Sequence, residues 1–293
     1  MATHLCLLAV QFIFAAFPVV AKIAFREVSP WALAWVRLAI AALILLVWFY
    51  GFGRERIEPA DFRNLFLLSV FGVSLNQLCY LRGLSLTTAI NATILVGMIP
   101  VFTFLIALVL GKESTSLPKT AGVFLGFSGV FVLAGPGPVS FESQYTFGNV
   151  LLLTGAFSYA VFLVLGRNIM SRYHPMTVVT WIFTFGSITM LPFAWSELRE
   201  TNLLSFGAST WASIAFLTLF ASILAYFLVG VALKSASATL VAVYICMQPV
   251  LVAFLAVPIL GESITSMTVV SGALIFSGVV LSASHRPPEP VEG

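Results

Sequence analysis

Charge is scarce in this sequence, and that scarcity excludes most soluble folds. Only 9% of its 293 residues are Asp, Glu, Lys or Arg, whereas 60% are apolar and 27 are phenylalanine. A soluble domain carries about a quarter charged residues, so most of this surface is expected to face lipid. Cysteine is also rare: Cys6, Cys79 and Cys246 fall in apolar stretches without the spacing of metal ligands. No disulfide framework, metal or other cofactor is therefore expected, and the modest net charge of +3 gives no indication of nucleic-acid binding.

Long apolar runs make up most of the chain. A transmembrane helix needs about 20 mostly apolar residues, and cuts at charged, Pro-rich and Gly-rich stretches predict ten such helices. The first run lacks the basic start of a signal peptide, so we predict that it is a membrane span. The ten helices are expected near residues 5–22, 31–50, 64–82, 87–110, 117–134, 148–166, 176–194, 209–229, 236–260 and 266–284. The predicted fold class is an all-α membrane protein with short loops.

The sequence also repeats itself. The string Phe-Ser-Gly-Val at 127–130 recurs at 276–279, which is 149 residues later, and Pro100 recurs as Pro249 at the same offset. We therefore predict two repeats of five helices each, at residues 1–139 and 140–293. Because five is odd, the second repeat is expected to be inverted in the membrane, an arrangement typical of transporters with one central site. Duplication retained only as a scaffold is the alternative.

The basic residues predict an orientation. With both termini in the cytoplasm, nine Lys and Arg residues fall in inner loops and four in outer loops. This excess agrees with the positive-inside rule. We therefore predict a multi-pass protein of a cell membrane, with a bacterial inner membrane expected, and with cytoplasmic N- and C-termini.

Acidic residues and histidines are missing from the predicted helix centres. All 11 acidic residues fall in loops, tails or helix ends, and His4, His174 and His285 are peripheral. Proton-driven carriers usually hold a carboxylate or a histidine in mid-membrane, so transport is expected to be uncoupled or coupled through a less obvious group. The one clear charge inside a span is Arg37. It is a candidate counter-charge for an anionic group such as a carboxylate; alternatively, its long stem reaches the interface or bonds backbone carbonyls.

Uncharged polar side chains are the other candidates for binding a solute. An amide or phenol that faces lipid costs roughly 2–7 kcal/mol, so these groups are expected to face the bundle interior. Interhelical hydrogen bonding is the alternative, but a lined cavity is favoured for the Asn, Gln and Tyr residues that recur on several helices. The predicted substrate-binding residues are Gln11, Asn76, Gln77, Tyr80, Asn91, Met98, Trp181, Tyr226, Tyr244 and Gln248.

Pro100 and Pro249 are expected to kink two helices at matching positions. Each proline removes a backbone hydrogen bond and clashes with the preceding turn, so both sites are predicted to open space and to flex. A purely structural kink is compatible with this interpretation.

One string resembles an enzyme motif. Residues 126–129 read Gly-Phe-Ser-Gly, as in intramembrane serine proteases, but that chemistry needs a histidine within reach of the serine. No histidine is expected inside a span, and residues 275–278 read Ile-Phe-Ser-Gly in the other repeat. The string is therefore interpreted as helix packing, and no enzyme activity is expected.

Taken together, the chain resembles the EamA family of the drug/metabolite transporter superfamily over about residues 5–284. The resemblance rests on short motifs in both repeats, and Gly111-Lys112-Glu113 departs from the usual Gly-Glu pair. The motifs are Phe17-Pro18 with Lys22, Ser29-Pro30 with Arg37-Leu38, Leu84 with Thr88-Ala89, Pro100, Ala232-Leu233-Lys234, Ser237-Ala238, Pro249 and Leu260-Gly261-Glu262. The resemblance implies a ten-helix bundle in which helices five and ten pack to one side of a central cavity.

The resemblance also implies export of amino acids and related metabolites. We expect a carrier for a small-molecule substrate, aromatic or hydrophobic amino acids above all, that acts in the lipid bilayer as a monomer or homodimer. A sugar phosphate, nucleotide sugar, polyamine or drug carrier is the alternative, as is a non-transporting membrane scaffold. A phosphate would need several mid-membrane cations and a polyamine would need buried carboxylates, and the sequence offers neither.

Overall fold

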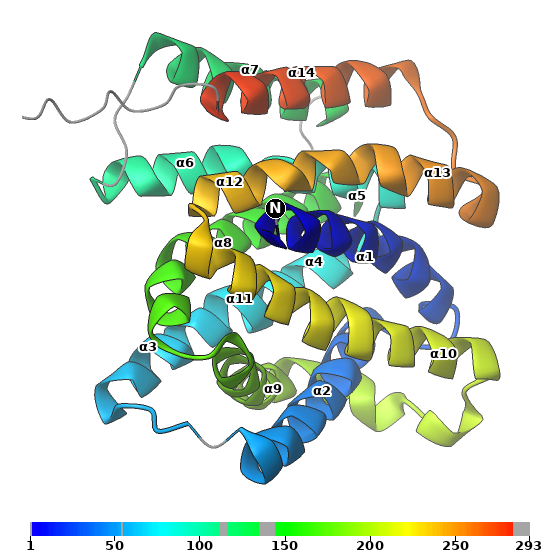
Figure 1. Ribbon diagram of the computed structural model, residues 1–293. Helices are drawn as coiled ribbons and strands as arrows, with labels where there is room; N and C mark the ends of the chain where they lie inside the picture. The colour runs from blue at the N-terminus through cyan, green and yellow to red at the C-terminus, as the bar shows by residue number, and fades with distance from the viewer. Residues whose placement is uncertain (1, 54, 112–115, 135–143, 284–293) are drawn as a thin grey trace, which may run out of the picture.

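The computed structural model describes residues 2–53, 55–111, 116–134 and 144–283, and it is helical throughout these ranges apart from short connections (Figure 1). The helices of the first half are α1 (Ala2–Ala24), α2 (Pro30–Phe52), α3 (Pro59–Ser69), the π-helix η1 (Val70–Leu75), α4 (Asn76–Ser85), α5 (Ala89–Val96), α6 (Ile99–Val109) and α7 (Leu117–Ala134). The second half contains α8 (Gln144–Arg172), α9 (Pro175–Glu200), the 3-10 helix η2 (Leu203–Ser205), α10 (Ala208–Phe216), the π-helix η3 (Leu217–Leu224), α11 (Ala225–Ser235), α12 (Ala238–Val243), the 3-10 helix η4 (Tyr244–Met247), α13 (Gln248–Leu260) and α14 (Ser266–Ala283).

These helices agree with the predicted spans. Eight continuous helical stretches of the described chain are long and apolar enough to cross a bilayer, and each coincides with a predicted span. The two remaining spans correspond to α7 and α14, of 18 residues each. The all-α membrane class is therefore confirmed, whereas the opposite orientation of the two repeats stays a prediction.

Helices α7 and α14 form a layer on one side of the bundle (Figure 1). Small residues allow the close approach: a Cβ atom on Gly278 would lie 2.5 Å from the Gly122 carbonyl oxygen, and one on Gly129 would lie 2.8 Å from that of Ser271. The Ser271 hydroxyl also donates to the Gly129 carbonyl at 2.7 Å. Small residues are the usual means by which membrane helices pack tightly, so this pair is scaffold rather than a wall of the interior.

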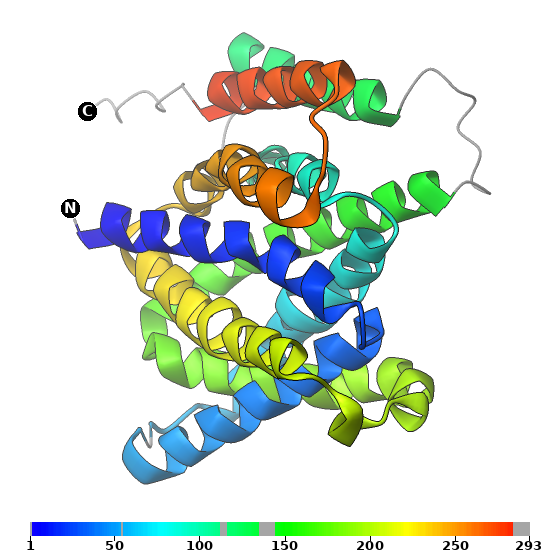
Figure 2. The same cartoon turned by 90° about the vertical axis from the view of Figure 1, so that its right-hand side faces the viewer.

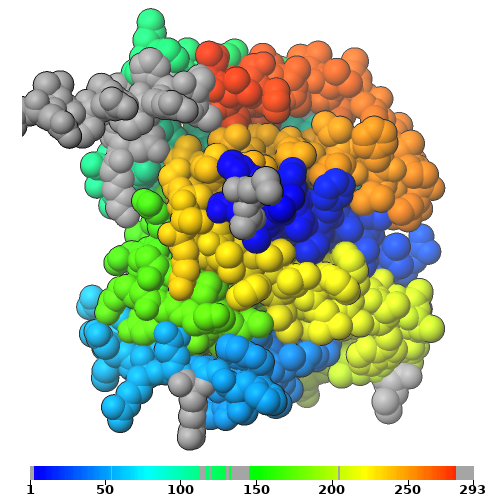
Figure 3. Space-filling model, in the orientation of Figure 1, coloured from blue at the N-terminus to red at the C-terminus, as the bar shows by residue number. Residues whose placement is uncertain are grey.

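The two halves are interleaved rather than set side by side. In the space-filling view, α1 of the first half (blue) lies between the α10–α11 and α12–α13 segments of the second half (yellow and orange; Figure 3). Helix α1 begins on the same side of the molecule on which α14 ends (Figure 2). We call that side the terminal face and the other side the opposite face.

The two prolines break their spans instead of only bending them. Pro100 is the second residue of α6, which follows a turn at Gly97 and Met98, and Pro249 is the second residue of α13, which follows the 3-10 helix η4. Proline fits the first turn of a helix because no hydrogen bond is expected from its nitrogen there. The third and eighth spans match in a further way, because each contains a π-helix, η1 or η3.

Candidate functional site: a central polar cavity

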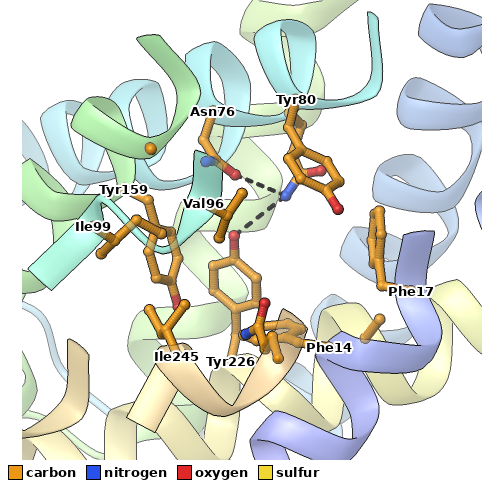
Figure 4. A pocket seen from close by; sticks show the side chains of 13 residues that line it. Phe14, Phe17, Asn76, Tyr80, Val96, Ile99, Tyr159, Tyr226 and Ile245 are labelled. Carbon is orange, nitrogen blue, oxygen red and sulfur yellow. Dashed lines mark hydrogen bonds between the residues drawn. The ribbon is translucent and has the colours of Figure 1, made fainter. Parts of the chain in front are cut away.

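A small cavity lies at the centre of the bundle, with a volume of about 70 Å³. Its walls come from both halves: α1, α4, α5 and α6 of the first half, and α8, η3, α11, η4 and α13 of the second (Figure 4). The lining residues are Phe14, Phe17, Asn76, Gln77, Tyr80, Val96, Ile99, Ala156, Tyr159, Ala221, Tyr226, Ile245 and Gln248. We call this space the central cavity.

A chain of hydrogen bonds fixes the polar wall. The Asn76 amide nitrogen donates to the Gly155 carbonyl at 2.9 Å, and the Gln77 amide nitrogen donates to the Asn76 side-chain oxygen at 3.0 Å. The same Gln77 nitrogen lies 3.5 Å from the Tyr226 hydroxyl, which in turn donates to the Gly72 carbonyl at 2.7 Å (Figure 4). Three side chains from two halves therefore hold one another in place, and the fold itself fixes the orientation of this polar wall.

The π-helices explain why this network forms here. A π turn displaces backbone carbonyls from the regular helical pattern, so side chains can bond them. Gly72 of η1 receives the Tyr226 hydroxyl, and Leu217 of η3 receives the Ser222 hydroxyl at 2.9 Å. Gln77 and Tyr226 also occupy equivalent positions at the repeat offset of 149 residues. The internal symmetry thus brings a matched pair of polar residues into contact at the centre.

Arg37 lies directly behind this wall. Only 1% of the residue is exposed, and its terminal nitrogens donate to the Ser222 hydroxyl at 2.6 Å and to the Gln77 side-chain oxygen. Its guanidinium carbon is 4.9 Å from the centre of the Phe17 ring, and its Nε atom is buried with no hydrogen-bond partner. The side chain therefore stays in the bundle interior and does not extend to the membrane interface.

Aromatic rings form the remaining walls. Phe14 and Tyr226 pack edge to face with 6.4 Å between ring centres, as do Phe17 and Tyr80 at 5.4 Å. The Tyr80 and Tyr159 hydroxyls have no hydrogen bond within the described part of the chain, and both residues line the cavity. This arrangement offers ring surfaces to an apolar group and hydroxyls to a polar one.

Five of the ten predicted substrate-binding residues line the central cavity: Asn76, Gln77, Tyr80, Tyr226 and Gln248. A sixth, Gln11, supports them from behind, because the Gln248 amide nitrogen donates to the Gln11 side-chain oxygen at 2.8 Å. The candidate counter-charge Arg37 is connected to the same wall through Gln77.

The other four predicted residues lie elsewhere. Trp181 packs against Phe62 with 5.0 Å between ring centres and lines a separate pocket beside Glu55 and Arg56. The Tyr244 hydroxyl bonds the His4 ring, and Met98 is buried under α7, where its sulfur would lie 3.3 Å from a Cβ atom on Gly126. Asn91 is half-buried near the start of α5, where its backbone N–H donates to the Thr88 hydroxyl. These spans are apolar on most faces, so the sequence does not tell which face a residue shares with the cavity.

Sequence reasoning missed several residues of the site. Phe14, Phe17 and Tyr159 line the cavity, and Ser222 bonds Arg37. A signal was available for two of them. In the first part of each repeat the offset is 145 residues rather than 149, and this offset pairs Phe14 with Tyr159 as equivalent aromatic residues. Thr218, Ser222 and Tyr226 follow one another at a helical spacing of four residues, so Ser222 shares a polar face with the predicted site residue Tyr226.

Carboxylates outside the cavity hold the starts of helices from the other half. Glu262 accepts the Ala89 and Ile90 N–H groups of α5 at 2.7 and 3.0 Å. Acceptors at a helix start satisfy free N–H groups and the helix dipole. From the place of Glu262 at the end of the ninth span, the sequence predicts that it caps the following helix or pairs with a cation; in the structure it caps a helix of the other half. Glu113, which ends the fourth span in the equivalent place and carries the same prediction, lies outside the described residues.

Similar contacts join α2 and α9. Glu197, near the end of α9, accepts the Trp31 N–H at 2.9 Å and the Ala32 N–H at 3.2 Å at the start of α2. Glu55, just after α2, accepts the His174 N–H at 3.0 Å immediately before α9. We refer to these contacts and that of Glu262 as the cross-half caps.

Glu27 makes a related contact at the opposite face. Its carboxylate accepts the Gly207 N–H at 2.8 Å, immediately before α10. This hydrogen bond, with a further one from Thr210, lowers the pKa of Glu27 below its ordinary value. The carboxylate is therefore ionised at neutral pH.

The serine of the protease-like string makes a local bond. The Ser128 hydroxyl donates to the Phe124 carbonyl of its own helix at 2.8 Å. This is the usual behaviour of a serine inside a helix.

Comparison with known proteins identifies relatives and a shared fold for this chain. The model of a family described as EamA-like transporters matches residues 1–135 and 146–284. An uncharacterized transporter from Archaeoglobus fulgidus is 33% identical over 286 residues, which is 97% of this chain and 98% of that protein. A WAT1-related protein from Arabidopsis thaliana is 24% identical over 294 residues, covering 87% of this chain and 75% of the relative. A crystal structure of 18% identity superposes with a TM-score of 0.68 over 97% of this chain and 96% of that one, which indicates a shared fold.

Proposed function

This chain belongs to the EamA-like transporter family, and from that membership we propose that it exports small metabolites, amino acids with aromatic or other apolar side chains above all, by alternating access. The observation that supports this most is the central cavity, where aromatic rings from both halves adjoin an ordered amide and hydroxyl wall. Sites for small molecules usually combine apolar walls with a few fixed polar groups. The rings suit an apolar side chain, and the wall suits a polar head group.

Alternating access is supported by the matched features of the two halves. Carriers built from inverted repeats hold their solute near the midplane, beside interrupted helices. Here the turn at Gly97 and Met98 and the 3-10 helix η4 interrupt the fourth and ninth spans at equivalent positions. The π-helices η1 and η3 do the same in the third and eighth spans. Each interruption replaces regular helix by backbone that rearranges at a lower cost.

Transport without proton coupling is supported by where the carboxylates lie. Within the described ranges, every Asp and Glu is in a connection, at a helix end or in the first turn of α3, so none is beside the central cavity. The same distribution disfavours a polyamine, and the single interior cation disfavours a phosphorylated sugar. We retain cytoplasmic termini and a bacterial inner membrane as the proposed placement, on the strength of the basic loops.

Counterflow in proteoliposomes tests this proposal. Vesicles that contain the purified protein are loaded with a mixture of the twenty amino acids, and uptake of each radiolabelled amino acid is followed with and without a pH gradient. We expect accelerated exchange of the aromatic and large apolar members and no effect of the gradient. Exchange of none of them would contradict the substrate assignment, and a strong response to the gradient would contradict uncoupled transport.

A matched pair of tyrosine variants connects the flux to the cavity. Tyr80→Phe removes a cavity hydroxyl that bonds no described residue, so we expect weaker solute binding with little change in thermal stability. Tyr145→Phe, at a residue that is 67% exposed, is the control. Equal flux in both variants and the wild type would show that the solute does not use this wall.

A further inference from the structure

Arg37 is a buried cation without a buried anion. It is 1% exposed, and its hydrogen-bond acceptors are the neutral side chains of Ser222 and Gln77. No carboxylate among the described residues lies within ion-pair distance of it, since the acidic groups of the described chain are confined to connections, helix ends and the first turn of α3. An ionised group this deep in a membrane protein is normally paired or used for function.

The positive charge of Arg37 acts on the central cavity, because the guanidinium lies close behind the cavity wall. Gln77 and Phe17 both contact the guanidinium and both line the cavity, so the charge lies one side chain behind the wall. Its Nε atom is buried without a partner, which leaves donor capacity unused. A negative group in the cavity would be attracted at a distance where a low-dielectric interior screens little.

A second group of cations lies at the opposite face. Lys22, Arg26 and Arg82 line a hollow there together with Glu27 and Glu262, which we call the basic vestibule. Both carboxylates are already committed to backbone N–H groups of the other half. Lys22 donates to the Thr87 carbonyl at 2.6 Å, and Arg82 lies over the Trp31 ring at 5.9 Å, so neither cation is neutralised by a direct ion pair within the described chain.

The cavity has no comparable group for an ammonium. Its lining contains no carboxylate, so only neutral groups are left for an ammonium: the Tyr80 and Tyr159 hydroxyls and the aromatic ring faces. The nearby guanidinium would repel a second positive charge. A zwitterion would therefore be attracted through its carboxylate and repelled through its ammonium, so it would bind less tightly than the carboxylate alone.

We infer that the carrier recognises its solute as an anion: an apolar group between the aromatic rings and one carboxylate attracted by Arg37, with the α-amino group dispensable. This inference rests on the proposed carrier function and narrows its substrate class to apolar monocarboxylates, of which amino acids are the weaker-binding members. The basic vestibule binds the same anion first and weakly, before the anion reaches the central cavity.

Four matched probes test this inference. They are 3-phenylpropionate (carboxylate only), L-phenylalanine (both groups), L-phenylalaninamide and phenethylamine (ammonium only). The assay measures competition with labelled 3-phenylpropionate counterflow and, in parallel, thermal stabilisation of the purified protein. We expect 3-phenylpropionate to act at concentrations at least tenfold lower than L-phenylalanine, and the two amines to act weakly or not at all.

An electrical measurement adds an independent readout. Net uptake of a monocarboxylate moves one negative charge, so a valinomycin-clamped potential that is positive inside should accelerate it. Net movement of zwitterionic L-phenylalanine is indifferent to the same potential. Potential-independent 3-phenylpropionate uptake would contradict carriage as an anion.

Substitutions at Arg37 test whether this residue causes the preference for the carboxylate. Arg37→Met should abolish the advantage of 3-phenylpropionate over L-phenylalanine, and Arg37→Lys should retain part of it. Arg63→Met is the control, because Arg63 is exposed on α3 and does not line the central cavity. If Arg37→Met does not fold, the order in which the four probes act on the wild-type protein tests the inference.

The outcomes separate the two proposals. Exchange of monocarboxylates without exchange of amino acids would overturn the amino-acid assignment and support the inference. Equal action of all four probes, or an unchanged preference in Arg37→Met, would overturn the inference while leaving the carrier in place. Absence of exchange for every probe and every amino acid would overturn both.

Discussion

Glu262→Gln should open the opposite face of the protein. The Glu262 carboxylate joins the end of the ninth span to the start of α5, through N–H groups of Ala89 and Ile90 at 2.7 and 3.0 Å. Glutamine keeps one neutral oxygen, so the substitution removes the charge and one of the two acceptor atoms. A state in which the halves separate at this face has already lost the contact, so only the closed state is destabilised.

The size of the effect follows from this geometry. A carboxylate at a helix N-terminus contributes about 0.3–1 kcal/mol when exposed and up to about 2 kcal/mol when partly buried, and Glu262 is partly buried. A loss of about 1–2 kcal/mol changes the ratio of closed to open states by about 5- to 30-fold, because about 1.4 kcal/mol corresponds to a factor of ten.

The assay follows access to the cavity directly. Val96→Cys, in a background without the three native cysteines, places a thiol on the cavity wall at the end of α5. Its rate of modification by a membrane-impermeant methanethiosulfonate added at the opposite face should rise 5- to 30-fold in Glu262→Gln. Glu200→Gln, at an exposed residue at the end of α9, is the matched control. An unchanged rate in Glu262→Gln, or an equal rise in the control, would refute a gating role for this contact.

Three further outcomes follow from particular contacts. Tyr226→Phe should lower stability by about 1–3 kcal/mol, because the buried Gly72 carbonyl loses its donor; thermal unfolding measures it. Gly278→Ala should weaken the packing of α14 on α7, because the added Cβ would lie 2.5 Å from a backbone oxygen, whereas Gly51→Ala meets nothing within 4 Å; the two melting temperatures should differ clearly. The lowered pKa of Glu27 means that its contact stabilises the fold above the ordinary glutamate pKa and is lost as pH falls through the lowered value. Melting curves at falling pH should therefore lose less stability in Glu27→Gln than in the wild type.

Each of these outcomes has a result that contradicts it. A wild-type melting temperature in Tyr226→Phe would mean that another donor reaches the carbonyl. Equal melting temperatures of Gly278→Ala and Gly51→Ala would mean that α14 moves away from α7 without loss of stability. Equal losses of melting temperature at low pH in Glu27→Gln and the wild type would show that this carboxylate takes no part in acid unfolding.

The positions of the spans were predictable from the sequence because each depends on a local property. Apolar runs of sufficient length define the helices, and proline lacks the N–H that a continuous helix needs, so Pro100 and Pro249 marked the interruptions. The kind of interruption was not predictable, since a turn and a 3-10 helix follow equally well from the same proline.

The site was predictable in part. Amides and phenols must be satisfied inside a membrane protein, which correctly placed Gln77 and Tyr226 in the interior. Trp181 and Met98 are also in the interior, but on faces directed at other helices, and an almost uniformly apolar helix carries no periodic signal for its orientation. The π-helices were not foreseen, because their residues have the same apolar composition as the α-helical turns on either side.

The reciprocal caps between α2 and α9 have a consequence for how such a chain can originate. The acceptor for the first N–H groups of α2 is supplied by Glu197, and the acceptor at the start of α9 is supplied by Glu55. A protein made of one half alone would lack these acceptors for the first N–H groups of its helices. Such an ancestor would gain the missing acceptors from a second copy, and fusion of the two genes would fix that pairing at one to one.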